Sequence, residues 1–374
     1  MPLAIERRLE PLQSRFAVTS AAVGAVLLAL VVCAALFAMV GVNPLEAYAS
    51  LMAEAFATER GIGYTVVRAT PLILIALGTI VAWRTGFGYL GFEGCFVVGA
   101  AACTAIALHG NPGGVLEDWP RLPMLLLCGA ASAAAGAAWA GLVGWVRIRW
   151  GGSEVLMSLM TNYIALLLVQ YLVSGPLRAP GGLPQSARLP ENSWLPLLME
   201  GSRAHAGIFI ALTSAALVWL LLRKTPLGYE MVLSGLSPRA ARYGGIAVGR
   251  RQLQAAMLAG ALGALAGLAQ VLGVHYRLMD GMSGGIGFIG IVVALLARLN
   301  PAGVVPVALL YGGLSVGADA MQRATGTPSS ITFILQALIV LLVLASPVVL
   351  RWRVVWRGRA SREGGTLAQG VGRG

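Results

Sequence analysis

The stretch from Thr70 to Ala100 reads TPLILIALGTIVAWRTGFGYLGFEGCFVVGA, and it decides the fold class. It contains most of one apolar run, 63–82, and the start of a second, 87–108. A helix needs about 20 mostly apolar residues to cross the hydrocarbon core of a bilayer. The stretch therefore predicts two membrane-spanning helices, joined by a hinge of glycine and aromatic residues.

The same pattern continues through the chain. Of its 374 residues, 57% are hydrophobic and only 11% are charged, whereas soluble domains carry about 25% charged residues. We therefore expect an all-α, polytopic membrane protein. The sequence predicts ten spans, at 20–42, 63–82, 87–108, 122–146, 154–174, 205–222, 252–274, 286–299, 302–320 and 330–350.

The distribution of basic residues predicts the orientation. With ten spans and a cytoplasmic N-terminus, 19 of the 27 basic residues fall on the cytoplasmic side, as the positive-inside rule expects. Both termini are then cytoplasmic, and the membrane is the bacterial inner membrane. The predicted division is an N-terminal segment 1–19, a transmembrane domain 20–350 with a cytoplasmic loop 223–251, and a basic tail 351–374.

Several function classes lack their motifs. The net charge of +12 comes from residues scattered between apolar runs, which argues against a nucleic-acid surface. The single lysine, Lys224, is followed by Thr225 but has no glycine-rich loop before it, so the chain has no Walker A site. GxSxG and HExxH are absent, and the histidines and cysteines show no metal-ligand spacing. We expect neither an enzyme nor a cofactor or metal.

Polar residues inside apolar spans are costly and usually face a cavity or a partner. Glu93, between Gly91 and Gly94, is a candidate for the substrate path or for a structural hydrogen bond. Asn162, Tyr163 and Gln270 are further path candidates, and interhelical hydrogen bonding also explains the amides. Glu154, Arg68 and Asp319 lie near span ends, where snorkelling to the interface explains them.

The loop 223–251 has helix signals of its own. Ser237 can cap a short helix, Pro238 suits the first helical position, and Gly244-Gly245 can end it. Arg239, Arg242 and Tyr243 are then available for contacts with a partner. Alternatively, the two arginines only keep the loop on the cytoplasmic side.

Two hinges suggest an internal repeat. GFGYLGFEG (Gly86 to Gly94) and GGIGFIG (Gly284 to Gly290) each lead into a short apolar helix. In the predicted topology they start from opposite sides of the membrane, as in an inverted repeat with broken helices near a central site. Ordinary glycines in membrane helices are the alternative.

These residues resemble a known family. The segments that carry the resemblance are Thr70 to Ala100, SEVLMSLMTNYIALLLVQYLVSGPLR from Ser153, GLSPRAARYGGI from Gly235, and GGIGFIGIVVALLARLNPAGVVPVALLYGGL from Gly284. They are similar to permease subunits of ABC importers for simple sugars and nucleosides. Tyr89 stands where the family usually has Asn, and Cys95 where it has Gln.

The resemblance implies the pore subunit of an ATP-driven importer for a small polar solute, with a nucleoside preferred and a simple sugar as the alternative. It implies three partners: an ABC ATPase, a second permease subunit, identical or homologous, and an extracytoplasmic solute-binding protein. Tyr89 joins the path candidates because its ring could stack on a ring-shaped ligand. The ATPase would bind Gly235, Ser237, Pro238, Arg239, Arg242, Tyr243 and Gly244.

Three other functions remain open at this point. A transporter driven by an ion gradient would need several titratable residues in the bundle to relay the proton or ion, and Glu93 is a single one. A membrane enzyme acting on lipid lacks a nucleophile or metal cluster. A membrane scaffold would require that no solute moves.

Overall fold

The computed structural model describes residues 3–7, 15–39, 41–198, 201–326, 329–349 and 352–356. The chain divides into two compact units, one of residues Met1–Gly41 with Phe333–Gly374, and one of residues Val42–Thr332. The second unit contains every segment that the following site uses.

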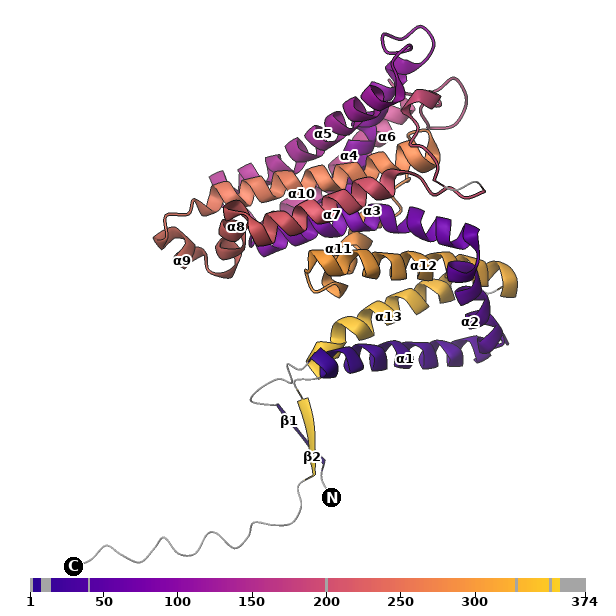
Figure 1. Ribbon diagram of the computed structural model, residues 1–374, viewed down its shortest axis with the longest axis vertical. Helices are drawn as coiled ribbons and strands as arrows, with labels where there is room; N and C mark the ends of the chain where they lie inside the picture. Colours follow the sequence, from indigo (N-terminus) through magenta and orange to yellow (C-terminus); the bar gives the residue numbers. More distant parts are fainter. Residues whose placement is uncertain are drawn as a thin grey trace, which may run out of the picture. The chain divides into compact units, whose positions relative to one another are not determined.

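Helices dominate the unit Val42–Thr332 (Figure 1). They are α2 (Pro44–Met52), α3 (Glu59–Arg84), α4 (Phe92–Ala107), α5 (Arg121–Trp150), α6 (Glu154–Ser174), α7 (Gly207–Lys224), α8 (Pro226–Leu236), α9 (Pro238–Tyr243), α10 (Val248–Gln270), α11 (Ile286–Leu296) and α12 (Pro301–Thr325). Short π or 3-10 turns occupy η1 (Ala53–Ala57), η2 (Leu108–Gly110), η3 (Glu191–Ser193) and η4 (Val271–His275).

Helix α3 forms the centre of this unit. Every residue from Ala69 to Ala82 is buried, which is expected of a helix that is apolar all round. Gly78 allows a close approach, because a Cβ there would lie 2.8 Å from the ring of Phe92 and 2.9 Å from the carbonyl oxygen of Ala259. Helix α10 therefore packs directly against α3, and the ring of Phe92 at the start of α4 also reaches it.

Among the described residues, seven helices are long and apolar enough to cross a membrane. Six are α3, α5, α6, α7, α12 and α4 extended through η2; the seventh is α10 extended through η4. Helix α11 is apolar but has only 11 residues. The span expected at 87–108 begins later, at Phe92, because residues 85–91 are not helical. The count of ten spans stays a prediction.

The other unit contains α1 (Arg15–Met39), most of α13 (Ser329–Val349) and two short strands. Strands β1 (Leu3–Arg7) and β2 (Trp352–Trp356) pair antiparallel, with Leu3 opposite Trp356 and Arg7 opposite Trp352. The all-α class is confirmed for the helical unit, and the sequence did not predict this ribbon. The valines and tryptophans of β2 suit a strand.

Candidate functional site

The segment 85–91 leaves helix α3 in a turn, in which Thr85 N and Gly86 N donate back to Ala82 O and Trp83 O. It then reaches α4 in a non-helical conformation. Gly86 has φ of +76°, a conformation that favours glycine. A Cβ on Gly86 would also lie 3.1 Å from the Cα of Gly235 in α8. Glycine is therefore required here both for the turn out of α3 and for the approach of α8.

One face of α6 supports this segment. Glu154, Ser158 and Asn162 recur every fourth residue, so their side chains lie along one face of the helix. Glu154 Oε1 accepts a hydrogen bond from Gly88 N (3.3 Å), and Ser158 Oγ accepts one from Leu90 N (3.1 Å). Asn162 Nδ2 donates to Leu90 O (3.0 Å). These side chains pair main-chain groups that would otherwise be buried without a partner.

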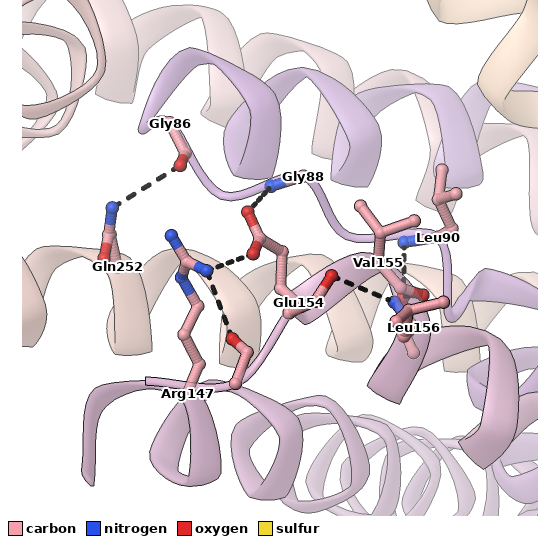
Figure 2. Close-up of polar contacts among 11 residues, drawn as sticks. Gly86, Gly88, Leu90, Arg147, Glu154, Val155, Leu156 and Gln252 are labelled. Carbon is pink, nitrogen blue, oxygen red and sulfur yellow. Dashed lines mark hydrogen bonds and ion pairs between the residues drawn. The ribbon is translucent and has the colours of Figure 1, made fainter. Parts of the chain in front are cut away.

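Arg147 fixes the first of these side chains. Its guanidinium donates to Glu154 Oε2 and to Gly152 O (3.3 Å), at the junction of α5 and α6. Figure 2 shows Glu154 between Arg147 and the main chain of Gly88, with Gln252 of α10 reaching Gly86 O (3.5 Å). The ends of α5 and α10 therefore also contact the polar groups around the segment.

Glu93 connects the start of α4 to the start of α11. Its side chain is buried, and its two oxygens accept hydrogen bonds from Gly285 N (3.0 Å) and Gly287 N (2.7 Å). Main-chain amides in a first helical turn lack partners within the helix, and the helix dipole favours a negative charge there. Glu93 thus caps α11 from another helix.

Helix α4 is capped in the same way. Its N-cap residue, Gly91, has no side chain to accept a hydrogen bond. Asn162 Oδ1 of α6 accepts one from Gly94 N instead, at 2.8 Å. A relay of caps therefore runs from α6 to α4 through Asn162, and from α4 to α11 through Glu93.

Of the predicted path residues, Tyr89, Glu93 and Asn162 gather around the start of α4, and all three are buried. The Tyr89 hydroxyl lies 3.0 Å from Cys95 Sγ and donates to Gly91 O (3.2 Å). Its ring meets that of Phe92 edge to face, with centroids 5.2 Å apart. In this conformation Tyr89 is part of the packed core.

Tyr163 and Gln270 lie elsewhere. Tyr163 follows Asn162 on α6 but is 62% exposed, whereas Asn162 is 3% exposed. Gln270 ends α10, and its Nε2 lies 3.4 Å from His275 Nε2. These two residues do not join the cluster at the start of α4.

The snorkelling interpretation missed contacts of three charged residues. Glu154 is the end member of the α6 face, and the regular spacing of Glu154, Ser158 and Asn162 was a signal that could have revealed it. Arg68 pairs with Asp319 at 3.0 Å, which connects α3 to α12. Sequence reasoning had no signal for this pair, whose members are 251 positions apart.

The predicted short helix in the loop 223–251 is confirmed as α9. Ser237 Oγ accepts a hydrogen bond from Ala240 N (3.4 Å), Pro238 is the first helical residue, and Gly244 is the C-cap. Gly245 follows with φ of +80°. The preceding helix α8, capped by Thr225, was not resolved by the sequence analysis.

Helix α9 combines a buried contact with an exposed face. Arg239, Arg242 and Tyr243 are exposed, and Tyr243 is 95% accessible. Gly235, just before α9, packs so closely on the end of α3 that a Cβ would lie 2.1 Å from Arg84 O. Arg251 Nε donates to Glu230 Oε2 (2.6 Å) and ties α10 to α8. Helix α8 thus connects α9 to the start of the segment 85–91.

In the part of the chain that the structure describes, no group of three or more His, Cys, Asp and Glu side chains could hold a metal ion. The polar groups of the site are instead paired with main-chain amides and carbonyls of neighbouring helices. This arrangement holds broken helices in position within an apolar bundle.

Residues 61–344 match the family described as branched-chain amino acid transport system / permease component. The chain is 32% identical to the glucose ABC transporter permease protein TsgB13 of Haloferax volcanii, over 88% of each chain. It is 33% identical to the guanosine ABC transporter permease protein NupP of Bacillus subtilis, over 86% of this chain and 92% of the relative.

A third relative is the nucleoside ABC transporter permease protein NupB of Lactococcus lactis, 30% identical over 83% of this chain and 86% of the relative. The family match covers the two hinges, the α6 face and the α8–α9 segment. The apolar helices, and the helix starts capped by side chains of other helices, are consistent with the family match. The chain belongs to this family of multi-pass membrane permease components of ABC transporters.

Proposed function

We propose that the chain forms the pore of an ATP-driven importer that translocates a nucleoside or a related nucleobase compound. The observation that carries this proposal is the similarity to the guanosine and nucleoside permeases, which extends over more than four fifths of each chain. A simple sugar is the second candidate, because the glucose permease is equally similar.

Uptake of radiolabelled guanosine, uridine and glucose distinguishes the two candidates. The full chain is produced with its partner subunits in cells that lack other transporters for these compounds. Accumulation of guanosine or uridine, and no accumulation of glucose, supports the nucleoside proposal. Accumulation of glucose alone would establish the sugar alternative.

ATP hydrolysis belongs to a separate ABC ATPase in this proposal. The residues before Lys224 form helix α7, whereas the lysine of a phosphate-binding loop follows a glycine-rich loop. A second permease subunit, identical or homologous, and an extracytoplasmic solute-binding protein complete the assembly. Uptake into proteoliposomes that lack the ATPase but carry a proton or sodium gradient would instead favour a secondary transporter.

The proposed topology has ten spans in the bacterial inner membrane with both termini in the cytoplasm. The division into an N-terminal segment 1–19, a transmembrane domain 20–350 and a tail 351–374 follows from it. A Pro190→Cys substitution in a cysteine-free background tests the side of the loop 175–204. Labelling of this position from the cytoplasmic side alone would overturn the topology.

The contacts around the segment 85–91 support a route for coupling. The ATPase would move α9, and α8 would carry the movement through Gly235 to Gly86. The relay of caps would then pass it to α4 and, through Glu93, to α11. The meeting of the two helix starts at Glu93 also supports the inverted repeat, with Tyr89, Glu93, Asn162, Tyr163 and Gln270 proposed to line the path in a more open state.

Docking of the ATPase on α9 has its own test. In an Arg239→Gln, Arg242→Gln double variant, Arg84, Arg223, Lys224, Arg250 and Arg251 still mark the cytoplasmic side, so the chain should insert normally. We expect loss of ATPase association or of substrate-stimulated ATP hydrolysis. Intact coupled transport would identify the two arginines as topology signals only.

A further inference from the structure

Helices α5 and α10 lie side by side (Figure 1). Gly136 and Gly260 meet where the two helices pack. A Cβ on Gly136 would lie 2.3 Å from Gly260 O. On the outer side of this contact the two helices leave an apolar groove of about 320 Å³. Its lining residues are Ala137, Ala138, Gly141, Leu142, Trp145, Leu253 and Met257.

A basic pocket of about 480 Å³ lies between the end of α5, the end of α9 and the start of α10. Arg147, Arg242 and Gln252 line it, together with the first residues of α10. Helix α10 has no side-chain cap at Ala247, so its first amides add a positive partial charge to that of the arginines. Arg242 is exposed, and Arg147 pairs with Glu154 through its Nη1 atom.

The groove and the pocket follow one another along the same two helices. On α5, Gly141 and Trp145 of the groove share a face with Ile148 of the pocket. On α10, Leu253 of the groove shares a face with Gly249 of the pocket. Both volumes are within the range of about 300–1,000 Å³ that is typical of ligand pockets. The apolar groove thus leads along α5 and α10 to the basic pocket.

Trp145 and Trp150 place the meeting point of the groove and the pocket at the edge of the bilayer. Their rings pack edge to face at 4.9 Å, both are at least half exposed, and Arg147 and Arg149 lie between them in sequence. Tryptophan and arginine at the end of an apolar helix mark the membrane–water interface. A lipid there has its phosphate level with the pocket and its acyl chains level with the groove.

We propose that this surface binds one anionic phospholipid, with the phosphate at the start of α10 and an acyl chain between α5 and α10. Basic pockets between membrane helices suit anionic head groups, and the apolar lining of the groove suits a hydrocarbon chain. The site is separate from the proposed substrate path. Arg147 lines the pocket and also binds Glu154, which supports the segment 85–91.

An Ala247→Asp substitution tests the head-group pocket. Aspartate is a good N-cap and suits a helix N-terminus, so it should preserve the fold while it repels a phosphate. Ala247→Asn caps equally well without the charge and is the matched control. Arg242 stays unchanged in every variant, because it also belongs to the face proposed for the ATPase.

The groove has a second pair of variants. Ala138→Phe fills it, whereas Ala134→Phe puts the same ring on an exposed position of α5 one turn beyond the lining residues. This pair keeps the proposal testable if Ala247→Asp does not fold.

Binding of phosphatidylglycerol to the purified full-length chain is measured by native mass spectrometry and by thermal shift. Phosphatidylcholine and inorganic phosphate are the comparison probes. We expect phosphatidylglycerol alone to bind with saturation. Ala247→Asp should raise its Kd by about fivefold or more, the effect of one basic residue at a membrane surface, and Ala247→Asn should not. Ala138→Phe should weaken binding, and Ala134→Phe should leave it unchanged.

Three results would overturn the proposal. Equal binding of phosphatidylcholine would mean an ordinary annular lipid, and full competition by inorganic phosphate would mean a free anion site. Unchanged lipid binding by both Ala247→Asp and Ala138→Phe, with loss of ATPase association in Ala247→Asp, would assign the pocket to the ATPase instead.

Discussion

The segments that precede α4 and α11 are alike in sequence, but neighbouring residues hold them by different sets of hydrogen bonds. In 85–91, main-chain groups of Gly88, Tyr89 and Leu90 are paired with side chains of α3 and α6. In 276–285, Tyr276 and Leu278 pair with Leu189 and Ser186 of the long loop between α6 and α7, residues 175–206. The remainder, 280–285, reaches α11 with three glycines at positive φ.

Space around the two segments differs as well. A Cβ on Gly281, Gly284 or Gly285 would meet nothing within 4 Å, whereas one on Gly86 would meet Gly235 at 3.1 Å. The first segment is therefore fixed by its neighbours, and the second can change shape at low cost. We expect 280–285 to be the part that rearranges when the pore opens, with Glu93 as its main anchor to α4.

The largest expected effect comes from removing that anchor. Glu93→Ala leaves two first-turn amides of α11 unpaired, at a cost of about 1–3 kcal/mol for each buried group, and we expect it to abolish transport. Glu93→Gln keeps one acceptor oxygen and should impair transport less. The measurement is substrate uptake relative to membrane abundance. Normal uptake by the alanine variant would remove Glu93 from the site.

Asn162→Ala should loosen the first segment. It leaves Gly94 N and Leu90 O without partners, so the free energy of unfolding in detergent should fall by about 2–4 kcal/mol. Asn162→Asp keeps the acceptor for Gly94 N and should lose less. If alanine and wild-type chains unfold at the same denaturant concentration, the α6 face does not hold the segment as described.

The long loop that supports the second segment should respond to pH. His205, outside the spanning helices, is buried against Gly273, and its Nε2 has no partner. Burial lowers the pKa of His205 from its usual 6.5 to about 4. The folded state therefore binds the proton less well than the unfolded state, and stability present above pH 6.5 is lost as the pH falls toward 4, by at most about 3 kcal/mol.

Thermal unfolding between pH 7.5 and 4.5 measures this dependence, with His205→Gln as a non-titrating comparison. The wild-type chain should lose more stability over this range than the variant. Parallel pH profiles for the two chains would show that His205 does not titrate between the folded and unfolded states.

The smallest expected effect is that of Gly281→Ala. The left-handed conformation alone costs a non-glycine residue about 1–2 kcal/mol, and nothing surrounds this position. Gly86→Ala carries the same conformational cost and the contact with Gly235 in addition, so it should destabilise more and also reduce coupled transport. Equal destabilisation by the two substitutions would contradict the difference between the segments.

Local signals in the sequence predicted local structure well. The cap of α9 depends on Ser237, Pro238 and Gly244, which interact within a few residues, and the structure has them as expected. The apolar runs likewise predicted the seven helices of the described residues that are long and apolar enough to cross a membrane. Helix α2 and the turn η1 were missed, because residues 44–57 are neither long nor apolar enough to stand out.

Long-range partners could not be predicted in the same way. The sequence marked Glu93 as important and left both of its roles open, because its partners Gly285 and Gly287 lie 192 and 194 positions away. The spacing of Glu154, Ser158 and Asn162 could have indicated a polar face of α6, but not its partner Gly88, which lies 66 positions from Glu154. Residue type and position within a span indicate that a polar group needs a partner, but not which one.

The bond from Glu93 to α11 has a consequence for the design of chimaeras. It ends on the main-chain amides of Gly285 and Gly287, which every residue except proline supplies, so the cap needs no partner side chain on α11. Glycine is still favoured at both positions, because Gly285 has φ of +81° and a Cβ on Gly287 would lie 2.5 Å from Glu93 N. The first turn of α11 should therefore be exchangeable with that of a relative, provided that the donor keeps glycine at 285 and 287 and the recipient keeps the glutamate.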